Sequence, residues 1–338
     1  MSKNQSEINH VAAPTKGRGG LLGWLTAWRP GRPGTRAAQE SLTALLYGMP
    51  QLILYFGLQL LPFLVALPIM FTDRIDFLDV NVDYVGWSNL YSLFQEPLRP
   101  VFLEALRRTV IFTLVTYIVV ICLGFLLALA MFELTAKIRG VFFTIIYMPW
   151  MISGVGIGLM MIMLFSRDTG TANLILEEAG AGRNLLDARS EGAAIYALPF
   201  IYGWKTAGFN MALFLGGLLA IPKETIESSR IDGANYLNRI FHIYLPQMVP
   251  SVVIVTIFTI INSFGIFDEL VGLGALGGNR NAQFLSVFIY ELGFGGAANM
   301  GTRTGTLAQA ITASLVVFLP LVLAAFWLNR LQKRLQYT

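Results

Sequence analysis

The sequence is poor in charged residues, in cysteine and in histidine. Charged residues make up only 13% of its 338 residues, against roughly 25% in an ordinary soluble domain, and the mean hydropathy is +0.62. Cys122 is the only cysteine, so no disulfide forms within the chain. His10 and His242, the only histidines, lack the spacing of zinc ligands. These shortages exclude a soluble globular domain and predict no metal site.

Motifs of common catalytic centres are also absent. The chain holds no H-E-x-x-H and no G-x-S-x-G, and none of its six lysines follows a glycine, as the phosphate-binding lysine of a P-loop must. We therefore predict a chain that is not an enzyme and binds no cofactor itself. The glycine-rich run 272–278 follows no strand–helix unit, so we expect a flexible external loop there rather than a phosphate site.

Long apolar runs dominate what is present. Five runs carry no charge, a sixth is interrupted only by Lys205, and each reaches the roughly 20 residues that cross a bilayer. The predicted fold is an all-α integral membrane protein with six transmembrane helices and both termini on one side. The predicted spans are 49–71, 109–132, 141–165, 193–219, 248–267 and 307–328.

Loop charges predict the orientation. Segments 1–48, 133–140, 220–247 and 329–338 hold 14 Lys/Arg against 6 Asp/Glu, whereas segments 72–100, 166–192 and 268–306 hold 7 against 13. Because positive loops stay inside, the first set is cytoplasmic, and with it both termini. Residues 1–48, rich in proline and glycine over 29–36, are expected to form a flexible basic tail. Residues 329–338 form a short basic C-terminus, and no nucleic-acid partner is predicted.

The cytoplasmic segment 222–246 has an unusual design. Pro222 suits the first turn of a helix, and Glu224 and Glu227 follow where the positive end of the helix dipole favours carboxylates. Gly233 then lets the chain turn where a side chain would obstruct it.

A second short helix is predicted after this turn. Ile240, Ile243 and Tyr244 share one of its faces, and Pro246 is expected to end it at the membrane. Such a helix–turn–helix is suited to insertion into a groove on a cytoplasmic partner. On spacing alone, a plain connector between two spans is the alternative.

The spacing in this segment resembles the EAA motif of ABC importer permeases, which reads E-A-A, three residues, G, nine residues, I-x-L-P. Here Glu227, Ser228 and Ser229 stand for E-A-A, Gly233 for the glycine, and 243–246 for the final residues. The two serines replace small alanines by another small residue. The resemblance covers 86–334 and is closest to the carbohydrate-importing branch. Its landmarks there are 86–90, 204–209, 221–223 and 264–268.

The resemblance implies the transmembrane-domain fold of a type I ABC importer in a bacterial inner membrane. It implies a second permease, an ABC ATPase dimer that binds ATP and Mg, an extracytoplasmic solute-binding protein, surrounding lipid and a sugar-like substrate. The residues expected to couple to the ATPase are Glu224, Glu227, Ser228, Ser229, Asp232, Gly233, Ala234, Ile243, Leu245 and Pro246.

Polar residues inside the spans predict a substrate path. Lys205 is the one charge within a span, and a buried charge there is a functional hypothesis by default. The alternative is a purely structural role, in which Lys205 pairs with Asp268 or a backbone carbonyl or extends its stem toward the interface. Trp87, Tyr91, Trp150 and Tyr290 are interpreted as interface or packing residues. The candidates for the path are Tyr202, Lys205, Thr206, Phe209, Asn210, Thr259, Asn262 and Ser263.

Hydroxyl, amide and aromatic groups suit an oligosaccharide, glycoside or polyol. Interhelical hydrogen bonds explain the same residues without a substrate. Two further alternatives stay open at this point: the same importer with a phosphodiester, amino acid or peptide cargo, and an ATP-independent channel or secondary carrier.

Overall fold

The computed structural model describes residues 36–181, 187–295 and 305–335. Every regular element in these ranges is helical, apart from one isolated bridge between Thr72 and Tyr84, so the prediction of an all-α chain is confirmed. The chain divides into two compact units, Met1–Val65 and Ala66–Thr338.

The described part of the first unit is one long apolar helix that continues past the boundary. It comprises α2 (Arg36–Tyr55), η1 (Phe56–Leu60) and α3 (Leu61–Ile69). The helix begins at Arg36, so residues 36–48 are not the flexible tail that we expected. The alanines, glutamine, glutamate and leucines that follow Arg36 are good helix formers, which accounts for the early start. Residues 1–35 of the predicted tail lie outside the described residues.

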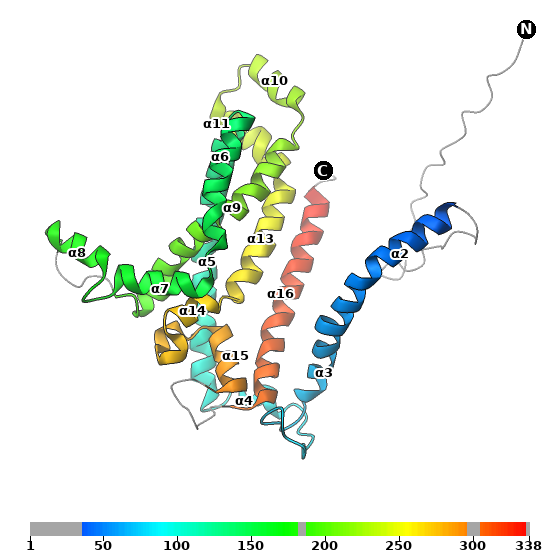
Figure 1. The fold of residues 1–338 in the computed structure, drawn as a ribbon, viewed down its shortest axis with the longest axis vertical. Coiled ribbons are helices and arrows are strands. Elements are labelled where there is room, and N and C mark those ends of the chain that lie inside the picture. Colours follow the sequence, from blue (N-terminus) through cyan, green and yellow to red (C-terminus); the bar gives the residue numbers. More distant parts are fainter. Residues whose placement is uncertain (1–35, 182–186, 296–304, 336–338) are drawn as a thin grey trace, which may run out of the picture. The chain divides into compact units, whose positions relative to one another are not determined.

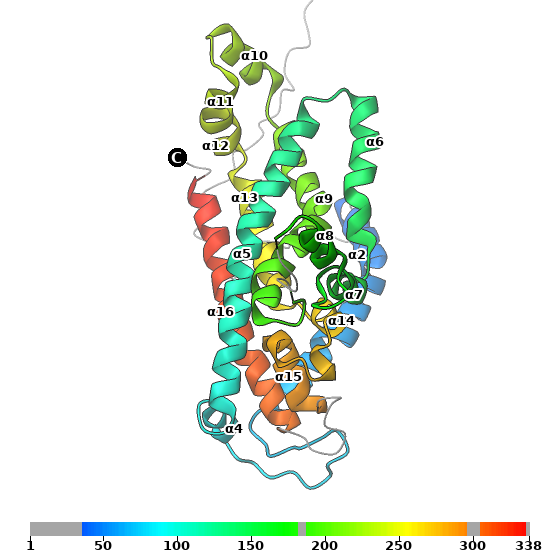
Figure 2. The ribbon, with the colours of Figure 1, turned by 90° about the vertical axis from the view of Figure 1, so that its left-hand side faces the viewer.

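The second unit is built around the helices α5 (Leu98–Phe132) and α9 (Leu198–Leu219), which pack along each other (Figure 1). Gly124 on α5 makes close approach possible, because a Cβ there would lie 3.0 Å from the Asn210 Cβ of α9. Next to this pair run α13 (Val249–Phe264) and α16 (Leu307–Leu335), as Figures 1 and 2 show. Short helices α4 (Ser88–Ser92), α8 (Thr171–Glu178) and η3 (Ala193–Ala197) complete this frame.

The segment predicted as a single span over 141–165 is broken. Helix α6 (Ala136–Tyr147) with η2 (Met148–Met151) meets α7 (Gly154–Phe165) at a bend of 89°. Pro149 has no N–H to continue the helical hydrogen bonds, and Ser153 starts the new helix by accepting a hydrogen bond from the Gly156 N–H at 3.2 Å. An apolar run without charge therefore does not guarantee a straight helix.

Helix α7 leaves the direction of α6 because it packs on α14 (Asp268–Gly272). Their backbones cross at Gly158 and Gly272, where a Cβ added to Gly158 would lie 2.3 Å from the Glu269 carbonyl oxygen. The chain then forms η5 (Ala275–Gly277), η6 (Arg280–Ala282) and α15 (Leu285–Phe294). Gly272, Leu273 and Ala275 are buried and Ala275–Gly277 is helical, so the expectation of a flexible loop at 272–278 was wrong.

Segments from the two predicted sets of loops lie near opposite ends of α5. At one end, Arg139 donates hydrogen bonds to the carbonyl oxygens of Met131, Phe132 and Leu134 and so caps the C-terminus of α5. Phe132 also contacts Tyr244 of the 222–246 segment, with ring centroids 5.8 Å apart.

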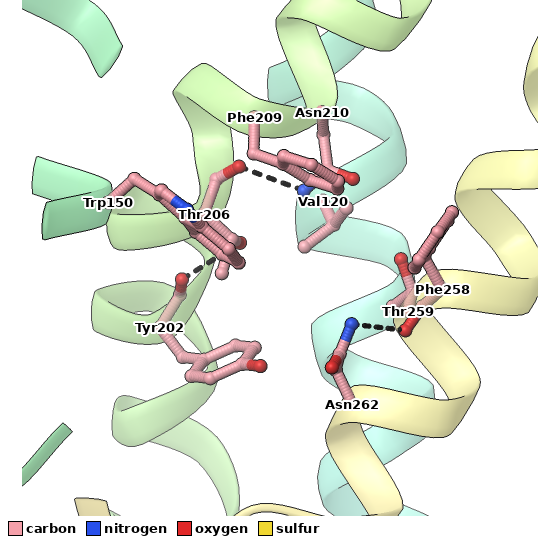
Figure 3. A pocket seen from close by; sticks show the side chains of 9 residues that line it. All are labelled: Val120, Trp150, Tyr202, Thr206, Phe209, Asn210, Phe258, Thr259 and Asn262. Carbon is pink, nitrogen blue, oxygen red and sulfur yellow. Dashed lines mark hydrogen bonds between the residues drawn. The ribbon is translucent and has the colours of Figure 1, made fainter. Parts of the chain in front are cut away.

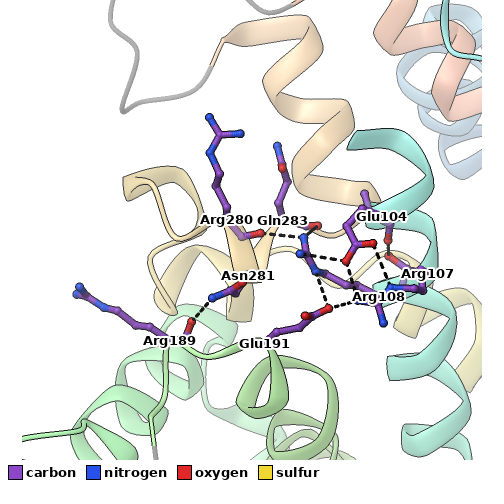
Figure 4. Close-up of polar contacts among 10 residues, drawn as sticks. Glu104, Arg107, Arg108, Arg189, Glu191, Arg280, Asn281 and Gln283 are labelled. Carbon is purple, nitrogen blue, oxygen red and sulfur yellow. Dashed lines mark hydrogen bonds and ion pairs between the residues drawn. The ribbon is translucent and has the colours of Figure 1, made fainter. Parts of the chain in front are cut away.

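At the other end, an ion-pair network joins two predicted external segments, 166–192 and 268–306, to the N-terminal part of α5 (Figure 4). Arg108 on α5 lies 3.2 Å from Glu104 and 3.3 Å from Glu191, and its Nη1 donates to the Arg280 carbonyl oxygen at 2.9 Å. Arg107 pairs with the same two carboxylates. The network ties η6 and the start of the η3–α9 helix to α5.

By length and composition, three helices of the described residues are able to cross a membrane, and six spans result if each of three bent helix pairs counts as one. The six-span count and the cytoplasmic placement of both termini stay predictions.

Candidate functional site

Helix α10 (Lys223–Ile231) presents a polar face to solvent at the end of the second unit where α5 finishes (Figure 1). Its Glu224, Glu227 and Ser228 are exposed. Its inner face carries Ile226, which is 8% exposed and packs in the core cluster that includes Tyr244. The helix is therefore held by one face while the predicted coupling carboxylates stay accessible.

Gly233 ends this helix in a Schellman motif. Its φ is +78°, its N–H donates to the Arg230 carbonyl oxygen at 3.2 Å, and the Ala234 N–H donates to the Ser229 carbonyl oxygen at 3.0 Å. A Cβ at 233 would meet nothing within 4 Å. Glycine is needed here for its left-handed backbone, and not to avoid an obstructing side chain as we expected. Asp232, directly before it, is exposed.

The second short helix is present as α11 (Tyr236–Arg239), η4 (Ile240–Tyr244) and α12 (Leu245–Gln247). Ile240 and Tyr244 are buried, as their shared face predicts, and Ile243 and Leu245 are partly buried against the same cluster. The helix ends at Gln247, one residue after the predicted stop at Pro246, and a bend of 70° precedes α13. Pro246 follows the π-helical turn η4 within the continuous helical residues 236–247.

A small pocket lies between α9, α13, α5 and η2 (Figure 3). Its volume is about 20 Å³, enough for about one water molecule and far below the roughly 300 Å³ of a small-molecule site. A sugar therefore enters only if these helices separate. The pocket is lined by Val120, Trp150, Tyr202, Thr206, Phe209, Asn210, Phe258, Thr259 and Asn262.

The polar groups of the pocket are held by their own helices. Asn210 donates its amide to the Thr206 carbonyl oxygen at 2.9 Å, and Asn262 donates to the Phe258 carbonyl oxygen at 2.8 Å. The side-chain oxygen of each asparagine is left as an acceptor for a hydroxyl group. Asn262 and Phe258 are exposed, so the pocket is open on the α13 side.

Two of the predicted path residues do not line the pocket. Ser263 is fully buried, and no hydrogen-bond partner of its hydroxyl is present among the described residues. Lys205 binds Glu269 of α14 with Nζ to Oε1 at 2.8 Å, and the two side chains are only 12% and 8% exposed. Its partner is therefore Glu269 and not Asp268, because Asp268 at the start of α14 is exposed while Glu269 is turned inward.

Sequence reasoning missed three residues that line the pocket, Val120, Trp150 and Phe258, and it also missed Glu269, the partner of Lys205. Trp150 was assigned to packing or the membrane interface, but it stacks on Phe209 in the pocket wall, with centroids 4.9 Å apart and planes at 15°. The signal was Pro149 beside it, which marks the helix break that brings Trp150 to α9. Glu269 was counted as a loop charge, and only the fold shows that its segment is buried.

Comparisons with known proteins agree with this architecture. The chain is 32% identical over 191 residues to the arabinooligosaccharides transport system permease protein AraP of Bacillus subtilis, covering 56% of this chain and 59% of that protein. It is 27% identical over 271 residues to the sn-glycerol-3-phosphate transport system permease protein UgpA of Agrobacterium fabrum, covering 79% of this chain and 87% of that protein.

A solved structure shares the fold. A chain in the crystal structure of a bacterial alginate ABC transporter in complex with alginate pentasaccharide-bound periplasmic protein superimposes with a TM-score of 0.70 at 23% identity. The match covers 88% of this chain and 97% of that chain.

The fold and the loop thus define a multi-pass membrane transport component. A family model described as "Binding-protein-dependent transport system inner membrane component" matches residues 120–337. The chain belongs to this family, and the resemblance drawn from the EAA spacing is confirmed.

Proposed function

We propose that this chain is a permease subunit of an ATP-driven importer for an uncharged oligosaccharide, glycoside or polyol. The observation that carries the cargo class is the pocket, which offers hydroxyl, carboxamide and aromatic groups and has no charged residue in its lining. The relative named for arabinooligosaccharides supports an uncharged polyhydroxylated solute.

Coupling to ATP hydrolysis is assigned to the 222–246 loop. The exposed face of α10 combines Glu224 and Glu227 with Ile231, whose side chain is 86% exposed. A large apolar side chain in water beside carboxylates is typical of a surface that a protein partner covers. The partner is an ABC ATPase dimer that binds ATP and Mg, since this chain has no P-loop.

Two more partners complete the transporter. The pocket is open at Phe258 and Asn262, and a second permease subunit is expected to close it on that side. An extracytoplasmic solute-binding protein delivers the cargo at the end that carries the Arg107–Arg108 network. Alternating access then follows from movement of the loop relative to the pocket helices, and hydrolysis resets the inward-facing state.

The experiment co-expresses this chain with its candidate sister permease and ATPase, and measures how much ATPase is retained in detergent. The test variant combines Glu227→Ala with Gly233→Pro, and Glu178→Ala on α8 is the matched control, since Glu178 is an exposed carboxylate away from the loop. We expect the wild type and the control to retain the ATPase and the test variant to lose it while keeping its helical circular dichroism.

Uptake into proteoliposomes then tests the cargo. Radiolabelled neutral oligosaccharides are compared with glycerol phosphate, an amino acid and a short peptide, with the candidate solute-binding protein outside the vesicles and ATP inside. ATP-dependent uptake of a neutral oligosaccharide supports the proposal. Equal ATPase retention by all variants refutes the coupling role, and ATP-independent uptake identifies a channel or secondary carrier instead.

A further inference from the structure

Lys205 belongs by helical position to the pocket face of α9. It lies three residues after Tyr202 and four before Phe209, and both of these line the pocket. Residues at such spacing share one side of a helix. Lys205 is nevertheless absent from the lining, because its ammonium group is 2.8 Å from the Glu269 carboxylate.

Glu269 is confined, so it holds Lys205 from a fixed direction. A Cβ on Gly154 would lie 2.9 Å from its Cδ and 3.0 Å from its Oε1, which shows how closely α7 encloses the carboxylate. The backbones of α7 and α14 are in direct contact at Gly158 and Gly272, which have no side chains, and this contact fixes α14 against α7. The carboxylate is therefore unable to follow a moving lysine.

We propose that Glu269 is a specificity-determining residue, which keeps the Lys205 cation out of the pocket so that the pocket selects uncharged polyhydroxylated solutes. This inference rests on the proposed importer function. An unpaired ammonium group in an apolar interior is costly, and a lysine on its flexible four-carbon stem turns toward the nearest polar space. Without Glu269 that space is the pocket, one helical turn away, where the cation would favour carboxylate or phosphate solutes.

Fluorescence quenching of Trp150 tests the position of this charge without any cargo. The protein has six tryptophans, and a variant that keeps only Trp150 reports from the pocket wall. Iodide, an anion, is compared with neutral acrylamide in that background, in Glu269→Gln and in Glu269→Gln/Lys205→Met. The residues changed to phenylalanine are Trp24, Trp28, Trp87, Trp204 and Trp327.

We expect iodide quenching to rise roughly fivefold in Glu269→Gln, because a cation near the pocket concentrates the anion. Acrylamide quenching should stay unchanged, and the double variant should return to the background value. Unchanged iodide quenching in Glu269→Gln overturns the proposal. A rise in the double variant equal to that in Glu269→Gln also overturns it, because it would show that the substitution at 269 loosens the packing around Trp150 and that the Lys205 charge has no part in the effect.

Uptake provides a second measurement that keeps all six tryptophans. In proteoliposomes of the complete complex, Glu269→Gln should raise the ratio of oligogalacturonate to neutral oligosaccharide uptake about tenfold, and the added Lys205→Met should remove the effect. A ratio equal to that of the wild type overturns the proposal. Loss of ATP-dependent uptake already in the wild type refutes the importer function instead, and the quenching result then still decides where the charge lies.

Discussion

Replacing Gly272 by alanine tests whether the bare backbone crossing holds α14 against α7. The new Cβ would lie 2.3 Å from the Val155 carbonyl oxygen and 2.9 Å from the Gly158 Cα. Both neighbours are backbone atoms, so no side-chain rotation relieves the overlap and the two helices must separate. Overpacking of this kind costs about 1–3 kcal/mol. At about 2 kcal/mol, Tm should fall by roughly 3 °C for a chain of 338 residues.

The measurement is thermal unfolding in detergent, followed by tryptophan fluorescence. Gly216→Ala is the matched control, because Gly216 also lies in a helix but a Cβ there meets nothing within 4 Å. Alanine is the better helix former, so the control should be neutral or up to about 1 kcal/mol more stable. Equal Tm values for Gly272→Ala and Gly216→Ala would refute the conclusion that backbone contact between α7 and α14 stabilises their packing.

Three further perturbations probe the loop, the ion pair and a buried carboxyl. Gly233→Ala should weaken binding of the ATPase by about 1 kcal/mol, or roughly fivefold, because φ at 233 is +78° and alanine tolerates that conformation poorly. Asparagine tolerates it better, so Gly233→Asn should bind with an affinity between those of the wild type and Gly233→Ala, which a binding titration checks. Lys205→Met should lower the free energy of unfolding by about 3–5 kcal/mol, because it leaves Glu269 buried without a partner. Adding Glu269→Leu should restore most of that free energy in chemical denaturation. A double variant as unstable as Lys205→Met would contradict the role of the unpaired carboxylate. Burial raises the pKa of Glu291 above its ordinary 4.5, so the folded state favours the proton and wild-type stability falls as pH rises through the raised pKa. Glu291→Gln should therefore melt above the wild type at about pH 7, and the difference should close toward about pH 4; a constant difference argues against the carboxyl as its cause.

Much of the fold was predictable because apolar runs and helix signals are local. The run before Lys205 and the residues after it predicted a helix over 193–219, and the structure has helical residues over the same range. The turn at Gly233 and the buried face of Ile240 and Tyr244 were likewise visible in spacing alone.

What the sequence did not show depends on contacts between distant segments. The bend before α7 requires the partner surface of α14, more than 100 residues later in the chain. For the same reason Asp268 and Glu269 look alike as neighbouring acidic residues, and only packing against α9 and α7 decides which one meets Lys205. The pocket role of Trp150 follows from that bend as well.

The break at Met151 also has a consequence for the surrounding bilayer. The straight part of the broken segment, Ala136–Met151, extends about 26 Å, whereas the hydrocarbon core is about 30 Å thick. A helix shorter than the hydrocarbon core thins the bilayer locally, at a cost of a fraction of a kcal/mol for each ångström of mismatch. Trp150 lies at the end of this helical segment and forms part of the pocket wall. The length of the lipid acyl chains should therefore affect the position of the pocket wall. Transport measured across a series of lipid chain lengths should therefore peak in bilayers thinner than average.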